Sequence, residues 1–197
     1  MRLILASKSQ TRAQILRDAG LAIETIPADV DERAAEAPLT EEGFGADDIA
    51  AVLAQAKALD VSGRTPSATV IGADQTLECE GTRYHKPATQ ADARAQLLAL
   101  QGRTHTLHSA ISIARDGAPV FEHVTAAHIT MRPLSPKEVG AYMAHVGDAA
   151  LQSVGCYQIE GPGARLMDGI VGDHFTILGL PLLPLLGYLR SQDLLDF

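Results

Sequence analysis

The segment MRLILASKSQTRAQIL gives the strongest indication of the fold. The apolar run at residues 3–6 predicts a short buried strand, which leads directly into a helix with Ser9 as its cap. A strand that turns at once into a helix presents unpaired N–H groups and the positive end of the helix dipole. The hydroxyls of Ser7 and Ser9 and the guanidinium of Arg12 make this turn a candidate anion site. A plain helix cap beside a solvated Arg12 is the alternative.

Further strand and helix patterns follow this unit. Residues 21–28 alternate loosely as a second strand, and residues 29–48 read as an acidic loop rich in turn residues. Apolar residues at helical spacing then predict a helix over residues 47–59. A buried strand at residues 70–71 is expected to end at Gly72.

The second half of the chain carries clear start signals for helices and strands. Thr89 with Asp92, and Ser135 with Glu138, form capping boxes that begin two helices. Two long alternating strands surround the turn RDGAP, and residues 80–81 form another hairpin turn. Strand–helix units followed by antiparallel strands predict an α/β protein with a mixed sheet. We expect residues 1–197 to form one domain with two lobes around a central cleft.

Charge and composition exclude several classes of protein. The net charge of −8 argues against sequence-independent binding to DNA. The longest apolar stretch, residues 177–189, contains Pro181 and Pro184 and is too short to span a membrane. Two isolated cysteines and the lack of a signal-peptide pattern favour the cytoplasm. The histidines lack the spacing of a zinc site.

Two residues could provide catalytic chemistry after the first turn. Asp74 follows the expected strand end, where α/β sheets place residues that contact ligands, and it could bind a divalent metal or take a proton from water. A polar residue in a tight turn is the alternative. Lys57 lies at the rim of the apolar stripe on its helix, so it either extends into solvent or points into a cleft.

Two weaker signals complete the candidate set. Glu32 is one of several acids in the expected loop, and Lys86 precedes a proline that favours an extended backbone. Together the candidates are several cations, for binding phosphates, and two carboxylates, for a hard cation or for activating water. This is the combination that a phosphate-cleaving site needs.

A series of motifs along the chain resembles the Maf family of septum-formation inhibitors and nucleoside triphosphate pyrophosphatases. The motifs are, in order, LILASKSQTRAQIL, VDE, QAKA, IGADQTL, HKP, LQGRTHTLHSA, GCYQIEGPGARL and GDHFTILGLPL. The resemblance implies two lobes around an elongated mixed sheet, similar to the inosine triphosphate pyrophosphatases. It also implies hydrolysis of a nucleoside triphosphate to the monophosphate and pyrophosphate with Mg²⁺ or Mn²⁺, and it suggests a homodimer.

The resemblance assigns roles to the candidate residues. It makes Asp74 the proton acceptor, and it makes Glu32 and Asp74 the acidic residues near the metal. The phosphate-binding set that it implies is Ser7, Ser9, Arg12, Lys57 and Lys86.

Three positions bear on which base the substrate carries. Gln75 and Glu160 resemble the branch of the family that acts on 7-methyl-GTP, but that branch has Trp where this chain has Thr11. The branch acting on dTTP and UTP has Arg there, so the chain fits neither pattern fully. We therefore expect a purine or a modified purine. A nucleotide-binding regulator of cell division that does not turn over its ligand remains the alternative function.

Overall fold

The structure is a computed structural model that describes residues 2–195 and residue 197. Its elements are, in chain order, β1 (Leu3–Leu5), α1 (Gln10–Asp18), β2 (Ile23–Thr25), α2 (Glu32–Glu41), α3 (Ala46–Ser62), β3 (Thr69–Cys79), β4 (Thr82–Tyr84), α4 (Gln90–Leu100), β5 (Thr104–Arg115), β6 (Ala118–Met131), α5 (Pro136–Val146), η1 (Gly147–Gln152), η2 (Pro162–Leu166), β7 (Met167–Val171), α6 (His174–Ile177) and α7 (Leu182–Ser191).

The strands form a mixed sheet, which confirms the predicted α/β class. Its order is β2-β1-β3-β5-β6-β7, with β4 paired to β3 off this path. The strands β1, β2 and the start of β3 are parallel, whereas β4 and β7 run antiparallel to their partners. The chain divides into two compact units. Unit 1 comprises Met1–Gln75, His108–Thr125 and His174–Phe197, and unit 2 comprises Thr76–Leu107 and Ala126–Asp173.

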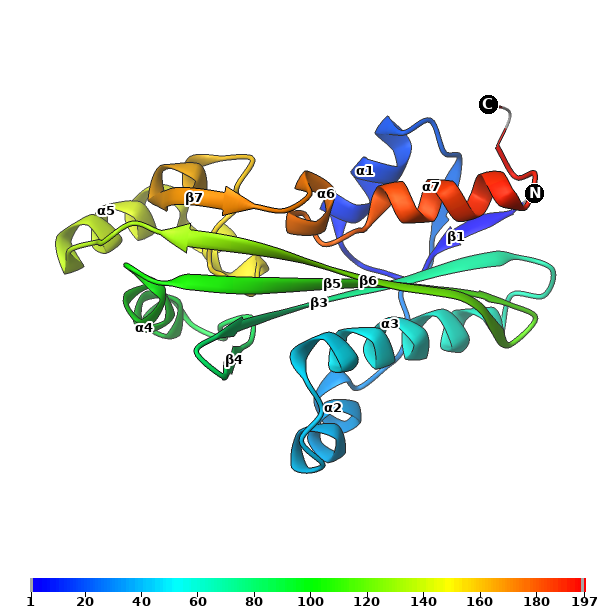
Figure 1. The fold of residues 1–197 in the computed structure, drawn as a ribbon, viewed down its shortest axis with the longest axis horizontal. Helices are drawn as coiled ribbons and strands as arrows, with labels where there is room; N and C mark the ends of the chain where they lie inside the picture. Colours follow the sequence, from blue (N-terminus) through cyan, green and yellow to red (C-terminus); the bar gives the residue numbers. More distant parts are fainter. Residues whose placement is uncertain (1, 196) are drawn as a thin grey trace. The chain divides into compact units, whose positions relative to one another are not determined.

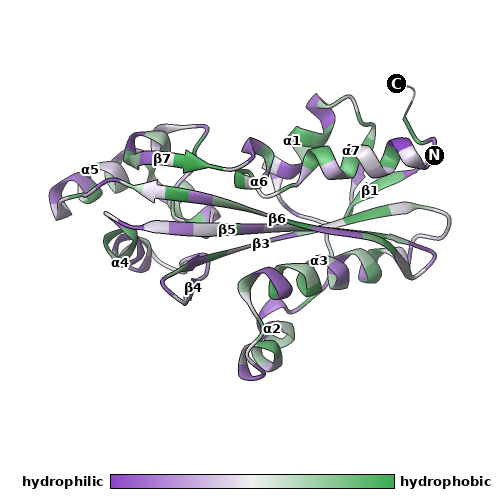
Figure 2. Cartoon of the chain, viewed as in Figure 1, coloured by the Kyte–Doolittle hydropathy of each residue, from purple (hydrophilic) through white to green (hydrophobic). Residues whose placement is uncertain are grey.

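Unit 1 has helices on both faces of its strands (Figure 1), with α1 and α7 on one side and α3 on the other. Alternate residues of β1 supply the two cores. Leu3 and Leu5 pack with residues of α1 and α7, whereas Ile4 packs with Val61 of α3. The helix α3 carries both hydrophobic and polar residues (Figure 2), and its buried residues Ile49, Leu53 and Val61 recur at helical spacing, as the predicted helix over residues 47–59 requires.

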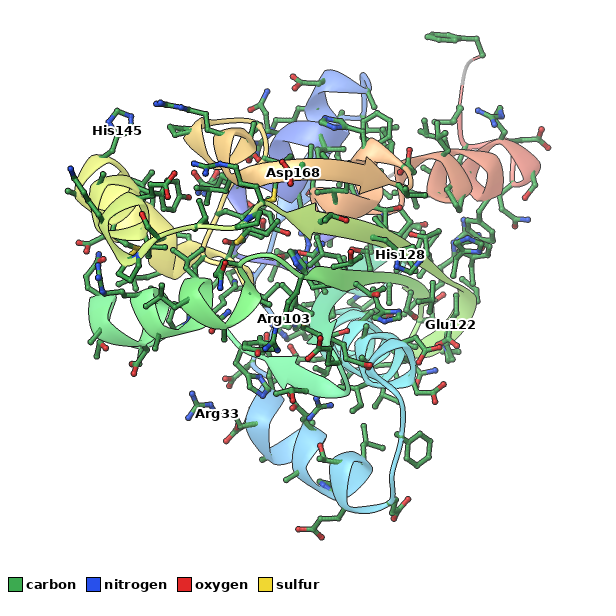
Figure 3. All side chains as sticks on the ribbon, turned by 60° about the vertical axis from the view of Figure 1, so that its left-hand side comes forward. Arg33, Arg103, Glu122, His128, His145 and Asp168 are labelled. Atoms are coloured by element: carbon green, nitrogen blue, oxygen red, sulfur yellow. The ribbon has the colours of Figure 1, made fainter. Side chains whose placement is uncertain are left out.

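The predicted loop over residues 29–48 is wrong for much of its length, because it contains α2. Asp31 caps this helix by accepting a hydrogen bond from the N–H of Ala34 at 3.0 Å. None of the residues of α2 is buried and Pro38 lies inside the helix, so the sequence has no row of large core-facing residues here and carries a residue that usually breaks helices. Arg33 extends from α2 away from the helix (Figure 3) and is exposed.

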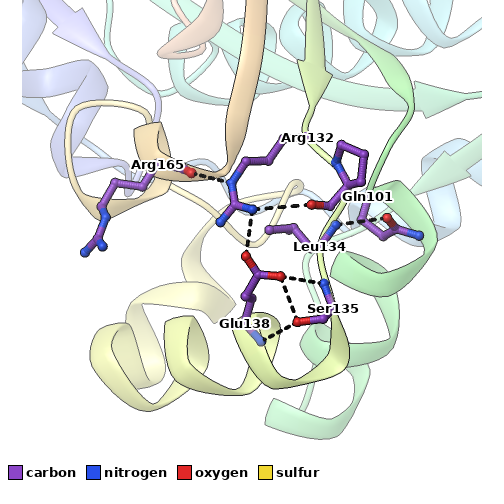
Figure 4. Close-up of polar contacts among 7 residues, drawn as sticks. Gln101, Arg132, Leu134, Ser135, Glu138 and Arg165 are labelled. Atoms are coloured by element: carbon purple, nitrogen blue, oxygen red, sulfur yellow. Dashed lines mark hydrogen bonds and ion pairs between the residues drawn. The ribbon is translucent and has the colours of Figure 1, made fainter.

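The structure of unit 2 confirms the two capping boxes and the hairpin turn predicted from the sequence. Glu138 accepts hydrogen bonds from the N–H and hydroxyl of Ser135 and forms an ion pair with Arg132 at 2.8 Å (Figure 4), so the predicted capping box begins α5. The second capping box begins α4. The hairpin between β3 and β4 pairs Cys79 with Thr82, around the predicted turn.

The length and hydropathy of the helices test whether any of them could cross a membrane. In the part of the chain that the structure describes, no helix combines the length and the apolar character that crossing a bilayer requires.

Candidate active site

Three charged side chains meet in unit 1. The ammonium of Lys57 lies 2.5 Å from Oδ1 of Asp74 and 2.6 Å from Oε1 of Glu32. The side chains of Lys57 and Asp74 are 10% and 9% exposed, whereas that of Glu32 is 55% exposed. The charge of Lys57 therefore turns inward onto two carboxylates and does not extend into solvent.

A close approach of helix and strand creates this cluster. A Cβ atom on Gly72 would lie 2.1 Å from the carbonyl oxygen of Ala54 and 2.7 Å from the nitrogen of Ala58, so the backbone of α3 rests directly on β3. Lys57 precedes Ala58 on that helix, and Asp74 lies two residues beyond Gly72 on the same strand. The missing side chain of one glycine thus brings the ammonium and the carboxylate together.

The predicted end of this strand at Gly72 is wrong. The strand β3 continues through Asp74 to Cys79. The parallel neighbour β1 pairs only as far as Ile71, which faces Leu5. Asp74 therefore lies beyond the last residue of β3 that pairs with β1. At this position its side chain lies close to charged residues of α2 and α3.

Burial governs the electrostatics of Asp74. Burial raises the pKa of its carboxyl above the ordinary value, against the opposing effect of the charges of Lys57 and Arg12. A carboxyl whose pKa is raised toward neutrality is a stronger proton acceptor when ionised. The negative charge of Glu32 acts in the same direction as burial.

Arg12 is held by backbone carbonyls. Its Nε donates to the carbonyl oxygen of Gly179, and its Nη1 donates to that of Ala73, both at 2.8 Å. Burial lowers the pKa of this guanidinium, while the negative charges of Asp74 and Glu32 oppose that shift. Arg12 therefore joins α1 to the residue before Asp74, and the simple picture of a solvated side chain is wrong.

Ser7 and Ser9 order the turn between β1 and α1. The N–H of Ser9 donates to Oγ of Ser7 at 3.1 Å, and Oγ of Ser9 accepts from the N–H of Arg12 at 3.3 Å. Ser9 is thus the predicted N-cap of α1. Arg12 Nη1 also lies 3.5 Å from Oγ of Ser7, so the hydroxyls and the guanidinium share one turn, as the sequence predicts.

Two of the three positions expected to select the base lie beside this turn. Thr11 is half-buried in the first turn of α1. Gln75 follows Asp74 on β3, and its amide nitrogen donates to Oγ of Ser109 and to the carbonyl oxygens of Thr176 and Ile177, each at 3.0 Å. Unit 1 therefore contains most of the predicted site.

The remaining predicted residues belong to unit 2. Lys86 is exposed in the segment between β4 and α4, and Glu160 is exposed in the turn before η2. Their roles in binding phosphate and base stay predictions.

Sequence reasoning missed the residues that hold the site in place. Ser109, Thr176, Gly179 and Gly72 were not among the candidates, although each lies within or next to a quoted motif. The hydrogen bonds that Ser109, Thr176 and Gly179 make to site residues join positions from 34 to 167 residues apart in the sequence. Spacing along the chain cannot reveal such partners.

Binding of a hard divalent cation such as Mg²⁺ would require oxygen ligands near Asp74. Among the residues that the structure describes, no group of three or more His, Cys, Asp or Glu side chains is arranged to hold a metal ion. Glu32 and Asp74 nevertheless provide two carboxylates on one ammonium. Mg²⁺ is commonly bound by one or two carboxylates together with the phosphates of a substrate, so this donor set fits an ion that binds with a nucleotide.

Comparisons with known proteins match nearly the whole chain. A family model described as "Maf-like protein" matches residues 2–192. A 7-methyl-GTP pyrophosphatase of Brucella abortus biovar 1 (strain 9-941) is 52% identical over 100% of this chain and 98% of its own length. A nucleoside triphosphate pyrophosphatase of Nitrobacter winogradskyi (strain ATCC 25391 / DSM 10237 / CIP 104748 / NCIMB 11846 / Nb-255) is 55% identical over 98% of this chain and 95% of its own.

The solved structures that match this chain share less sequence identity with it than these relatives do. A HAM1 protein from Coxiella burnetii is 20% identical with a TM-score of 0.44, over 66% of this chain and 73% of that chain. A similarity at this level says nothing about function.

Proposed function

The chain belongs to the Maf family, and from this premise we propose that it is a nucleoside triphosphate pyrophosphatase. The reaction is hydrolysis of the bond between the α and β phosphates, which gives a nucleoside monophosphate and pyrophosphate. Two relatives that match over nearly their whole length are named as pyrophosphatases of this type. The observation that carries the proposal is the buried Asp74 with Lys57 and Glu32 around it.

Asp74 is the group that takes the proton of the attacking water. Burial raises the pKa of its carboxyl, which makes the ionised form a better base. The ammonium of Lys57 at 2.5 Å keeps a fraction of that carboxyl ionised by stabilising its charge. When phosphates arrive, the same ammonium can turn toward their oxygens, which leaves Asp74 to accept a proton from water.

The turn before α1 and the basic residues Arg12, Lys57 and Lys86 are proposed to bind the phosphates. The hydroxyls of Ser7 and Ser9 and the positive end of the α1 dipole favour an anion there. Arg12 holds this turn against the residue before Asp74, which positions the phosphates relative to the base. Lys86 is the further cation proposed for the phosphates.

A divalent cation, Mg²⁺ or Mn²⁺, belongs to the proposal. Glu32 and Asp74 would hold it together with the nucleotide. Bound there, such an ion would spread the charge that develops on the phosphates in the transition state. The chain is proposed to act in the cytoplasm, without DNA or membrane, and as a homodimer.

The proposed substrate is a purine nucleotide, with 7-methyl-GTP as the leading compound. Support comes from the name of the Brucella relative and from Gln75 and Glu160, which resemble the branch acting on that nucleotide. A carboxylate such as Glu160 accepts the pair of N–H groups on a guanine edge, and it resists a base that presents only acceptors there.

The test is release of pyrophosphate from a panel of canonical, methylated and deaminated triphosphates with Mg²⁺. We expect turnover of at least one purine, and Asp74→Asn should lower kcat by at least 100-fold, in keeping with the loss of a general base, while nucleotide still binds. Measurable binding with no pyrophosphate from any nucleotide would instead favour the non-enzymatic regulator. Asp74→Asn with the wild-type rate would exclude Asp74 as the base.

A further inference from the structure

Gln75 is held by groups from two other elements of unit 1. Its Nε2 donates to Oγ of Ser109 on β5 and to the carbonyl oxygens of Thr176 and Ile177 on α6, each at 3.0 Å. Ser109 and Thr176 are fully buried, at 0% exposure. An amide side chain with this many partners on one nitrogen has little freedom to turn.

The chemistry of these partners permits only one orientation of the amide. The two carbonyl oxygens can only accept hydrogen bonds. The hydroxyl of Ser109 already donates its hydrogen to the carbonyl oxygen of Thr176 at 2.7 Å, so toward Gln75 it too can only accept. If the amide turned over, Oε1 of Gln75 would face three acceptors. The NH₂ group must therefore point inward.

The side chain of Thr176 also ties α6 to β6. Oγ1 of Thr176 pairs with Oγ1 of Thr125 on β6 at 2.7 Å. A shift of α6 that would release the amide of Gln75 must therefore also break this contact and the bond from Ser109. Several buried hydrogen bonds thus fix the same side chain.

The oxygen of Gln75 lies near Arg12, across the Cα atom of Gly179. A Cβ atom on Gly179 would lie 3.5 Å from Oε1 of Gln75 and 3.4 Å from Nε and Nη2 of Arg12. Gly179 has a φ of +87°, which favours glycine, and its small size leaves room between the amide oxygen and the guanidinium. Oε1 therefore lies on the side of Gln75 that also carries Arg12 of the phosphate-binding turn.

We propose that Ser109 and the carbonyls of residues 176–177 are positioning groups that present Gln75 to the substrate as a hydrogen-bond acceptor only. This inference rests on the proposed function, in which Gln75 contacts the base. An acceptor-only contact selects a base edge that carries N–H donors. Guanine has such donors at N1 and at its 2-amino group, whereas adenine has none at these two positions. Ser109 then contributes to specificity without touching the substrate.

The experiment is a double-mutant cycle read as a discrimination ratio, kcat/KM for 7-methyl-GTP over that for ATP. Ser109→Ala removes one acceptor from Gln75 and should lower the ratio roughly 3- to 10-fold, the value of one hydrogen bond. In a Gln75→Leu background the same change should move the ratio by less than about twofold, because no amide remains to be positioned. Ser109→Thr, which keeps the hydroxyl, should restore the ratio.

A matched control lies on the same strand. Ser112 of β5 is buried at 1% exposure, and within the described residues its hydroxyl makes no hydrogen bond. Ser112→Ala should leave the discrimination ratio unchanged. An equal effect of Ser109→Ala in both backgrounds, or none in the wild-type background, would overturn the positioning role.

A second readout needs no substrate. In the wild-type protein the side-chain NH₂ signals of Gln75, assigned by their loss in Gln75→Leu, should exchange slowly with solvent, and Ser109→Ala should speed this exchange. Rapid exchange in the wild-type protein would refute the orientation. If no triphosphate were hydrolysed, the proposed function would fail, and this measurement would still decide whether the amide is fixed.

Discussion

Replacing Lys57 with methionine removes the charge between two carboxylates and keeps the length of the side chain. Methionine adapts to irregular space in a core, so the packing of α3 on β3 should be retained. Asp74 would then be a buried carboxylate without its ammonium, whereas Glu32, whose side chain is 55% exposed, would be solvated by water. The effect on stability therefore concentrates on Asp74.

The magnitude follows from burial. Removing one partner of a buried ion pair costs roughly 3–5 kcal/mol, because an uncompensated charge is left in the interior. The side chains of Lys57 and Asp74 are 10% and 9% exposed, so solvent screening reduces this value little. We expect Lys57→Met to lower the free energy of unfolding at pH 7 by about 3 kcal/mol or more.

The loss should depend on pH in a defined direction. Burial already raises the pKa of Asp74 in the folded protein, and removing Lys57 removes a charge that opposes this shift. Between the ordinary pKa of aspartate and the raised value, the folded variant binds more protons than the unfolded chain. Its stability must therefore increase as the pH falls through this range. The deficit relative to the wild-type protein should be smaller at pH 5 than at pH 7.

The assay is urea unfolding followed by circular dichroism at both pH values. The double variant Lys57→Met/Asp74→Asn should recover most of the loss, since it buries no unpaired charge. Arg33→Met is the matched control, because Arg33 is an exposed cation on α2 that points away from the helix (Figure 3); it should change stability by less than about 0.5 kcal/mol. If Lys57→Met were as stable as the wild type, or the double variant no more stable than Lys57→Met, the reasoning would be refuted.

Two further outcomes test unit 2 and the helix–strand contact. Burial lowers the pKa of His105 from 6.5 to about 4, so the unfolded chain takes up the extra proton first; stability should fall by up to about 3 kcal/mol as the pH drops from 6.5 to 4. His105→Asn should flatten the dependence of unfolding free energy on pH, measured by urea titration. His145→Asn, at an exposed position of α5, is the control and should leave that dependence unchanged. The same pH dependence in the wild type and in His105→Asn would contradict the prediction. Gly72→Ala should cost roughly 1–3 kcal/mol in the same assay, because its Cβ atom would meet backbone atoms of α3 at 2.1 Å and 2.7 Å. Gly63→Ala, whose Cβ would have its nearest contact at 3.5 Å, is the control, and equal stability of the two variants would be the contrary result.

Features that depend on a few neighbouring residues can be read directly from the sequence. Ser9 caps α1, and the boxes at Thr89 and Ser135 begin α4 and α5, because a capping side chain bonds to a backbone group three residues away. The helix that carries Lys57 was predicted from its apolar stripe. The ordered motifs identified the family and most of the residues of the candidate site.

The interactions among those residues depend on the folded arrangement of distant segments. Lys57 turns inward because the bare backbone of Gly72 lets α3 approach β3. Arg12 binds the carbonyl of Gly179, which is 167 positions away. The amide nitrogen of Gln75 bonds to buried acceptors from β5 and α6. These contacts form because packing brings atoms that are distant in sequence within hydrogen-bond distance. Periodicity and spacing along the chain carry no information about such pairs.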